Sequence, residues 1–231
     1  MKKNNPNAEP QYDMLYEVER VHGRSTLGIM ANQSWNEDPK RHLFTLARYK
    51  FAAKILAGRS KVLEVGCADA FGTRLVQQAV GAVTAIDMND AFIADIDSRV
   101  NQKWPMKAFV HNMLNGPFLA EGYEYDAAFC LDVLEHINGA QEDLFISHVC
   151  GSISKYGVAI FGMPSIESQR WASPQSLEGH VNCQSGEQLK NTLERHFHNV
   201  FVFSMNDEVV HTGFYPMAHY LLAVCCAKIE L

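Results

Sequence analysis

The stretch that decides the fold is KVLEVGCADAFGT, residues 61–73. It opens with a short, mainly apolar run that contains the β-branched Val62 and Val65, a composition typical of a buried strand. Gly66 ends this run and allows a tight turn, because glycine lacks a Cβ. Small residues follow, and we expect a helix to begin near Thr73. A strand, a small-residue turn and a helix N-terminus together predict a nucleotide cradle, in which backbone N–H groups face the ligand.

Two other interpretations of this stretch have to be weighed. The dinucleotide fingerprint G-x-G-x-x-G would place glycine at positions 66, 68 and 71, but the chain has Gly66, Ala68 and Phe71. The bulky Phe71 would block the approach of a pyrophosphate, which disfavours that fingerprint. An ordinary βα turn without a ligand is the second interpretation, and the turn by itself does not exclude it.

The next predicted strand provides evidence that distinguishes a ligand-binding turn from an ordinary βα turn. Residues 82–86, AVTAI, form a second apolar run that ends in Asp87, 21 residues after Gly66. An acidic side chain about 20 residues beyond a glycine turn, at the end of the second strand, can accept hydrogen bonds from both hydroxyls of a ribose. This spacing favours a nucleotide-type ligand over an ordinary turn.

At this point the chain resembles the class I S-adenosylmethionine (SAM) dependent methyltransferases. The matching segments are residues 64–67 with Gly72, residues 86–88, and residues 126–137 (DAAFCLDVLEHI), and their order fits along roughly residues 60–165. Two departures are visible. The family usually has glycine where this chain has Ala68 and Ala70, and it often has aspartate where this chain has Asn112.

Strands and helices alternate along the chain, which predicts an α/β fold with a parallel sheet. The last two predicted strands lack an intervening helix and should pair antiparallel. The resemblance implies a Rossmann-like, seven-stranded, mostly parallel sheet with helices on both faces, whose last strand is antiparallel and lies between the fifth and sixth. We expect an N-terminal tail and helical cap at residues 1–58, with a helix from Asp38-Pro39 to Ala57, and a SAM-binding methyltransferase domain at residues 59–231.

Composition indicates which partners and which cellular compartment to expect. The chain has 231 residues, 47% hydrophobic, and a formal net charge of −6, which disfavours a nucleic-acid partner. Six cysteines occur without a CxxC pair, which is typical of a reducing compartment. The polar N-terminus shows no signal peptide, and the longest apolar run, Met217–Ala227, is too short to span a membrane. We therefore expect a cytoplasmic protein, a monomer or homodimer, with no membrane partner.

The resemblance implies SAM as the cofactor and assigns residues to it. Glu64, Gly66 and Ala68 would contact the amino-acid part, Asp87 the ribose, and Met88 the adenine. The Asn112 side chain can still accept a hydrogen bond from the adenine amino group. Similarity to the ubiquinone-type O-methyltransferases favours pairing of Arg48 with the SAM carboxylate, and the alternative is that Arg48 is a solvent-facing helical arginine. Met113 and Leu131 are also assigned to the cofactor.

The chemistry expected is methyl transfer to a small polar acceptor, with a hydroxyl oxygen as the first choice. A hydroxyl needs a base, and His180, which lies in the segment after the fifth strand, is the candidate. His211 is the second candidate, while for His136 in the LEH segment a structural role is favoured over a catalytic one. No His, Cys or Asp cluster has zinc spacing, so no metal is predicted. Alternatives are a non-catalytic SAM-binding protein and N-methylation of a small amine or amino sugar.

A final expectation concerns a lid. Residues 12–35 and 165–184 are rich in aromatic side chains and lack a regular period. Because methyl transfer must exclude water, we expect these two segments to meet over the cofactor and to form the acceptor pocket.

Overall fold

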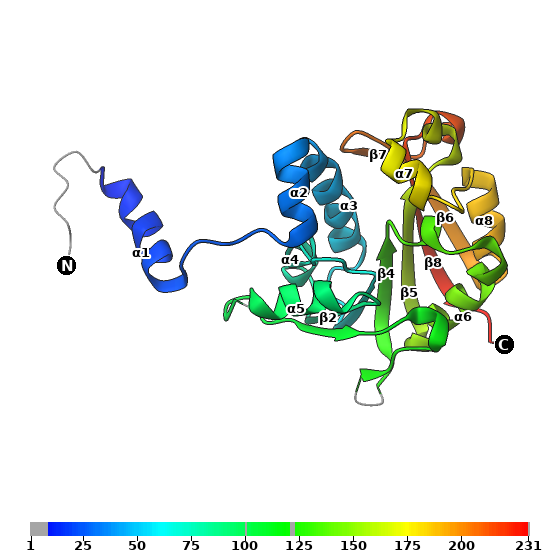
Figure 1. The fold of residues 1–231 in the computed structure, drawn as a ribbon. Helices are drawn as coiled ribbons and strands as arrows, with labels where there is room; N and C mark the ends of the chain where they lie inside the picture. Colours follow the sequence, from blue (N-terminus) through cyan, green and yellow to red (C-terminus); the bar gives the residue numbers. More distant parts are fainter. Residues whose placement is uncertain (1–8, 100, 121–122, 231) are drawn as a thin grey trace.

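A central sheet organises the protein, as seen in a computed structural model that describes residues 9–99, 101–120 and 123–230. Eight strands in these residues pair in the order β3-β2-β1-β4-β5-β8-β6-β7 (Figure 1). β1 to β5 are parallel, whereas β8 runs antiparallel between β5 and β6. The strands are β1 Lys61–Val65, β2 Ala82–Asp87, β3 Lys107–Val110, β4 Tyr125–Leu131, β5 Ile153–Pro164, β6 Phe197–Asn206, β7 Val209–His211 and β8 Tyr220–Lys228.

Helices join the strands and cover the sheet. The α-helices are α1 Asp13–His22, α2 Ile29–Glu37, α3 Arg41–Ile55, α4 Thr73–Gln77, α5 Asp90–Ser98, α6 Glu142–Ser152, α7 Pro174–Gly179 and α8 Gly186–Leu193. The 3-10 helices are η1 Pro10–Tyr12, η2 Met113–Asn115, η4 Leu134–His136, η5 Gly139–Gln141, η6 Ile166–Trp171 and η7 Tyr215–Met217.

The alternation of side chains along each strand builds a core on both faces of the sheet. On one face, Val62 of β1 and Phe129 of β4 pack with Tyr49 and Leu56 from the α3 side. On the other face, Leu63 packs among residues that include side chains of α6 and α8. The chain thus has the predicted Rossmann-like α/β architecture with helices on both faces (Figure 1).

The predicted antiparallel insertion of the last strand is confirmed, but the count of seven strands is wrong. The additional strand, β7, pairs with the end of β6 at the sheet edge. Asp207 adopts φ 49° in the two-residue connection between them, a left-handed conformation suited to a tight hairpin. A three-residue strand is too short to produce a readable period, which explains why the pattern missed it.

The N-terminal region differs from expectation. The helix predicted from Asp38 begins at Arg41, with Pro39 in the preceding turn. The predicted tail begins in residues 1–8, which lie outside the described residues. α1 stands away from the rest of the fold, and α7 lies on the far side of it (Figure 1). The helix α1 of the first predicted lid segment therefore lies away from α7 of the second.

The segment at residues 165–184 is more regular than its sequence indicates. It contains η6 and α7, and the side chains of Ser165 and Ser173 cap the two helices by accepting hydrogen bonds from backbone N–H groups. Serine caps of this kind stabilise short helices that have no apolar period of their own. α7 ends at Gly179, and His180 follows as its C-terminal cap.

Candidate functional site

The turn after β1 has the shape that glycine would give it. Gly66 has φ 72°, and a Cβ at this position would lie 2.2 Å from Cγ2 of Val133, in the segment that follows β4. Ala68 and Ala70 also adopt positive φ, 46° and 53°, although the left-handed region costs an alanine about 1 kcal/mol. The two alanines therefore replace glycine without changing the type of turn.

Asp87 at the end of β2 holds this turn in place. Its Oδ2 accepts a hydrogen bond from the Ala68 backbone N–H at 2.9 Å, and its Oδ1 accepts one from Asn89 N–H at 2.9 Å. Asp87 is half-buried, and each carboxylate oxygen has a further lone pair that can accept from a hydroxyl. Met88, the next residue, is 69% exposed at the same edge.

Glu64 points into the protein beneath the turn. It is buried, its Oε1 accepts from the Tyr49 hydroxyl at 2.6 Å, and its Oε2 accepts from Thr73 Oγ1 at 2.6 Å. Burial raises the pKa of the Glu64 carboxyl to about 7, the two hydrogen bonds oppose this, and Asp69 and Asp87 add to it. The residue assigned to the amino-acid part of a cofactor thus also ties α3 and α4 to β1.

Arg48 already has a carboxylate partner within the protein. Its Nη1 donates to both Oδ1 and Oδ2 of Asp132, at 2.7 Å each, and its guanidinium lies 3.8 Å from the centre of the Tyr220 ring. It is therefore not the solvent-facing arginine of the alternative interpretation. Arg48 Nε is buried and has no hydrogen-bond partner among the described residues.

Three other residues assigned to the cofactor have structural roles. The Asn112 side chain accepts a hydrogen bond from Leu114 N–H at 2.9 Å and caps η2. Met113 and Leu131 are buried, at 3% and 6% exposure, and both belong to the core clusters. Spacing alone places these residues at the sheet edge but does not distinguish core side chains from exposed ones.

Two of the three candidate histidines are brought together. His180, at the end of α7, lies beside His136, with ring centroids 5.3 Å apart. Backbone N–H groups of Val181 and Asn182 donate to the Glu135 carbonyl, at 2.8 and 3.0 Å, and hold this segment against η4. Burial lowers the pKa of His180, the neighbouring His136 lowers it further, and Asp132 opposes both.

His211 is occupied elsewhere. It lies on β7, where its Nδ1 accepts a hydrogen bond from Gly213 N–H at 2.9 Å, and its Nε2 faces the Asn206 amide at 3.5 Å. Because the lone pair on Nδ1 is used inside the hairpin, this ring is a poor candidate for a base.

Sequence reasoning did not find several residues that shape the site. Asp69 is buried, accepts from Ala31 N–H at 2.7 Å and from Phe71 N–H at 3.2 Å, and so anchors α2 to the turn. Gly28 fits closely against Asp69, since a Cβ there would lie 2.4 Å from it. These contacts join segments about 40 residues apart, and no local pattern signals them.

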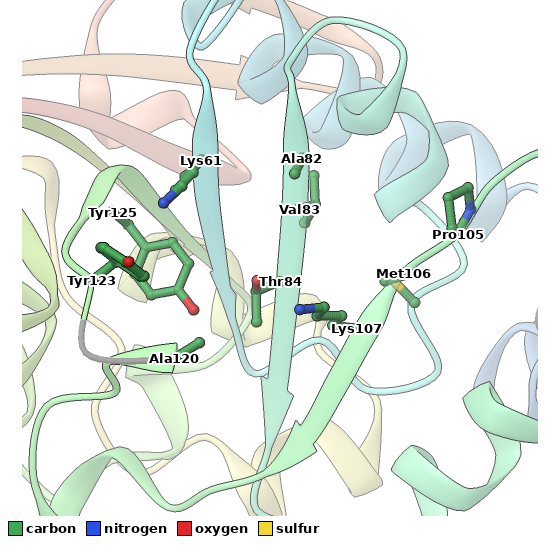
Figure 2. Close-up of a pocket in the computed structure, with 10 residues that line it drawn as sticks. All are labelled: Lys61, Ala82, Val83, Thr84, Pro105, Met106, Lys107, Ala120, Tyr123 and Tyr125. Atoms are coloured by element: carbon green, nitrogen blue, oxygen red, sulfur yellow. The ribbon is translucent and has the colours of Figure 1, made fainter.

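A cavity of about 340 Å³ lies at the opposite edge of the sheet. Figure 2 shows its lining residues, among them Lys61, Ala82 and Lys107, which begin β1, β2 and β3. Lys61 Nζ lies 4.2 Å from the centre of the Tyr123 ring. This cavity is therefore separate from the turn, Asp87 and the histidine pair, which all lie at the carboxyl ends of the strands.

Among the described residues, no helix combines the length and the apolar character needed to cross a membrane.

Comparison with known proteins agrees with the geometry at the carboxyl edge. Residues 62–157 match the family model described as "Methyltransferase domain". The ubiquinone biosynthesis O-methyltransferase of Xanthomonas campestris pv. campestris is 24% identical over 166 residues, 68% of this chain and 64% of that protein. Over these residues the chain is similar to methyltransferases. It spans 64% of the length of this curated relative.

Solved structures of other methyltransferases share the fold. The N-methyltransferase NodS from Bradyrhizobium japonicum, solved with S-adenosylhomocysteine (SAH), aligns with a TM-score of 0.59 at 16% identity, covering 92% of this chain and 97% of that one. An O-methyltransferase family protein from Burkholderia thailandensis aligns with a TM-score of 0.58 at 14% identity, covering 87% of this chain and 60% of that one. The overlap confirms the Rossmann-like methyltransferase fold.

The packing of the turn leads to a first prediction. Gly66→Ala should destabilise the protein by clearly more than Gly58→Ala, because both glycines have positive φ but only Gly66 faces a neighbour. The conformational cost is about 1 kcal/mol at each position, and the collision with Val133 adds to it only at residue 66. Urea unfolding measures the free energy of unfolding of both variants. Val133→Ala in the Gly66→Ala background should recover part of the loss, and equal losses for the two single variants would contradict the packing argument.

The burial of Glu64 leads to a second prediction, on pH. A carboxyl whose pKa rises from 4.5 to about 7 on folding keeps its proton in the folded state while the unfolded state loses it. Its contribution to stability is therefore complete below pH 4.5 and is lost as the pH rises to about 7, by roughly 3 kcal/mol. Glu64→Gln should remove this slope from the free energy of unfolding. Glu187→Gln, at an exposed position in α8, is the control. An unchanged slope in the Glu64→Gln variant would show that the carboxyl is already ionised in the fold.

Proposed function

We propose that the protein transfers the methyl group of SAM to a hydroxyl oxygen of a small acceptor. The observation that carries the proposal is the arrangement of the carboxyl edge: the Gly66 turn, the ribose-type acid Asp87, and an imidazole pair that follows β4 and α7. In open α/β sheets, ligands bind at this edge. The 24% identical O-methyltransferase supports an oxygen acceptor.

The residues at the edge suit the charges and hydroxyls of SAM. Asp87 keeps lone pairs that can accept from the ribose hydroxyls. Because Gly66 has no Cβ, Val133 after β4 can lie close against the turn. Glu64 is a buried carboxylate that an ammonium group would favour in its ionised form. Arg48 donates to Asp132 through Nη1, whereas its Nε is a buried donor without a partner in the described structure. When bound, SAM supplies an activated methyl group on a sulfonium.

The histidine pair provides a place for the acceptor proton. In the transfer, the acceptor oxygen forms a bond to the methyl carbon, the carbon–sulfur bond breaks, and its electron pair stays on sulfur. A hydroxyl acceptor must also lose its proton, and His180 Nε2 would accept it, because Nδ1 of this ring faces Gln169 Oε1. Methyl transfer also requires the acceptor oxygen, the methyl carbon and the sulfur to lie in line. Binding the cofactor and the acceptor together at the carboxyl edge would hold them in this geometry.

Two other functions remain to be tested against this one. A small amine that is already neutral does not need a base, so N-methylation would leave the imidazole pair without a chemical role. The alanines at positions 68 and 70, where the family usually has glycine, give slight support to a non-catalytic SAM-binding protein, but both adopt positive φ as glycine would. Neither alternative accounts for His136 and His180 lying together at this edge. The small size of the acceptor, the cytoplasmic location and the absence of a nucleic-acid partner stay predictions from the sequence.

Binding of SAH tests the cofactor assignment. Asp87→Asn should weaken SAH binding about tenfold, because one charged acceptor for the ribose is replaced by an amide. Asp90→Asn, on the exposed first turn of α5, should bind like the unchanged protein. Isothermal titration calorimetry measures the SAH affinity of the unchanged protein and of both variants. Preferential binding of NADH over SAH, or equal affinities for the two variants, would contradict the assignment.

Transfer itself is tested with SAM that carries an isotopic label on the methyl group. Incubation with a metabolite extract, followed by mass spectrometry, should give a labelled product whose methyl group is bound to oxygen. His180→Ala should lower kcat about 100-fold or more and leave SAH affinity nearly unchanged. His198→Ala, at an exposed position on β6, is the control. A fully active His180→Ala variant would exclude the proposed base, and a methyl group found only on nitrogen would favour the amine alternative.

A further inference from the structure

Helix α1 is amphipathic, and its apolar face is exposed. The ten residues Asp13–His22 include no buried side chain, and the helix stands away from the sheet (Figure 1). Met14, Val18 and Val21 recur at intervals of four and three residues, so they share one face of the helix, and Leu15 adjoins them one turn before Val18. All four side chains of this apolar face are at least half exposed. An isolated helix this short is only marginally stable in water, so α1 needs a surface to pack against.

A cavity of about 580 Å³ between α3 and α4, the α3–α4 cavity, has a mainly apolar lining. Leu43, Leu46 and Ala53 line it from α3, and Leu75 and Ala79 line it from the α4 side. The small alanine side chains leave space for another helix to approach closely. The lining extends over about three turns of α3, which is about the length of α1. The cavity can therefore accommodate a helix of this size.

The charges on α1 complement those around the α3–α4 cavity. The lining of the cavity contains Lys50, Lys54 and one acid, Glu208, so it is net positive. α1 contains three acids and one arginine, so with its histidine neutral it is net negative. Glu17 and Glu19 lie on opposite sides of the apolar face. Their exposed ion pairs with neighbouring arginines contribute little, so both carboxylates can pair with the lysines instead.

The connection between α1 and α2 directs α1 away from the cavity of its own chain. Residues 24–26 line a separate pocket together with Arg74 of α4 and Arg99, which follows α5. The connection therefore runs along the α5 side of α4, whereas the α3–α4 cavity lies on the α3 side. The chain is then held in place at Gly28, which fits closely against Asp69. The α1 helix of a second chain is not restricted in this way.

We propose that α1 of one chain docks into the α3–α4 cavity of a second copy, so that two chains form a homodimer by exchanging these helices. Each chain supplies one helix and one cavity, and a two-fold axis brings both pairs together in a closed assembly. The apolar face of α1 enters the apolar lining, and its acids reach the lysines at the rim. A membrane is a poorer partner, because helices that lie on lipid surfaces carry a basic polar face and α1 is net negative.

Sedimentation velocity of the full-length protein tests the exchange, because it measures the dissociation constant of the dimer. We expect the unchanged protein to form dimers at micromolar concentration. Val18→Asp on the apolar face and Leu46→Asp in the cavity should each raise the dissociation constant ~10-fold or more, because each buries an unpaired charge in the interface. Tyr16→Asp is the matched control, since Tyr16 is similarly exposed on α1 but lies off its apolar face. Thermal unfolding of each variant shows that it is folded.

Mixing the two variants distinguishes exchange between chains from docking within one chain. The Val18→Asp chain keeps an intact cavity, and the Leu46→Asp chain keeps an intact α1, so a mixture can form one correct interface. We expect heterodimers in the mixture at concentrations at which each variant alone is monomeric. Docking of α1 into the cavity of its own chain would leave the mixture monomeric, and that result would overturn the exchange.

Charge reversal at exposed positions tests the ion pairs separately from the apolar contact. Lys50→Glu combined with Lys54→Glu should weaken the dimer several-fold, and adding Glu17→Lys and Glu19→Lys should restore it. An unchanged protein that stays monomeric at every concentration, or a dimer whose dissociation constant is the same in all variants, would overturn the proposal. Binding of the monomeric protein to lipid vesicles, lost in Val18→Asp, would also overturn it and would assign α1 to a membrane surface.

Discussion

Burying carboxylates at the carboxyl ends of the strands is the constraint on which this structure depends. A buried acid needs hydrogen bonds or a cation, and Glu64 and Asp69 find their hydrogen bonds in different ways. Glu64 is held by Tyr49 and Thr73, which fixes α3 and α4 against β1. Asp69 is held by backbone N–H groups, one of which belongs to α2. Glu135 alone of these three keeps an oxygen without a partner in the described structure.

The same constraint explains how the cofactor turn tolerates alanine. Positive φ at Ala68 and Ala70 is unfavourable for any residue with a Cβ, so the turn needs outside support. Asp87 supplies it at Ala68, because its Oδ2 accepts that backbone N–H. The Cys67 carbonyl supplies it at Ala70 by accepting the N–H of that residue at 2.8 Å. The acid that suits a ribose is therefore also what keeps the turn in shape.

The sequence predicted what local patterns encode. Gly66 and Asp87 follow from spacing, and the antiparallel insertion of β8 follows from the missing helix together with the family resemblance. Features that depend on contacts between distant segments were missed. Spacing could not show that Met113 is a core residue, or that Arg48 is already bound by Asp132. Spacing likewise cannot show that His136 in η4 and His180, which follows α7, lie side by side.

The orientation of the two imidazoles decides which ring nitrogen is available for chemistry. The Nδ1 of each ring donates to a fixed carbonyl oxygen, so only Nε2 remains for chemistry. A general base must accept the acceptor's proton on the lone pair of such a nitrogen. The free lone pair on His180 Nε2 is therefore the feature that supports a histidine base at this edge.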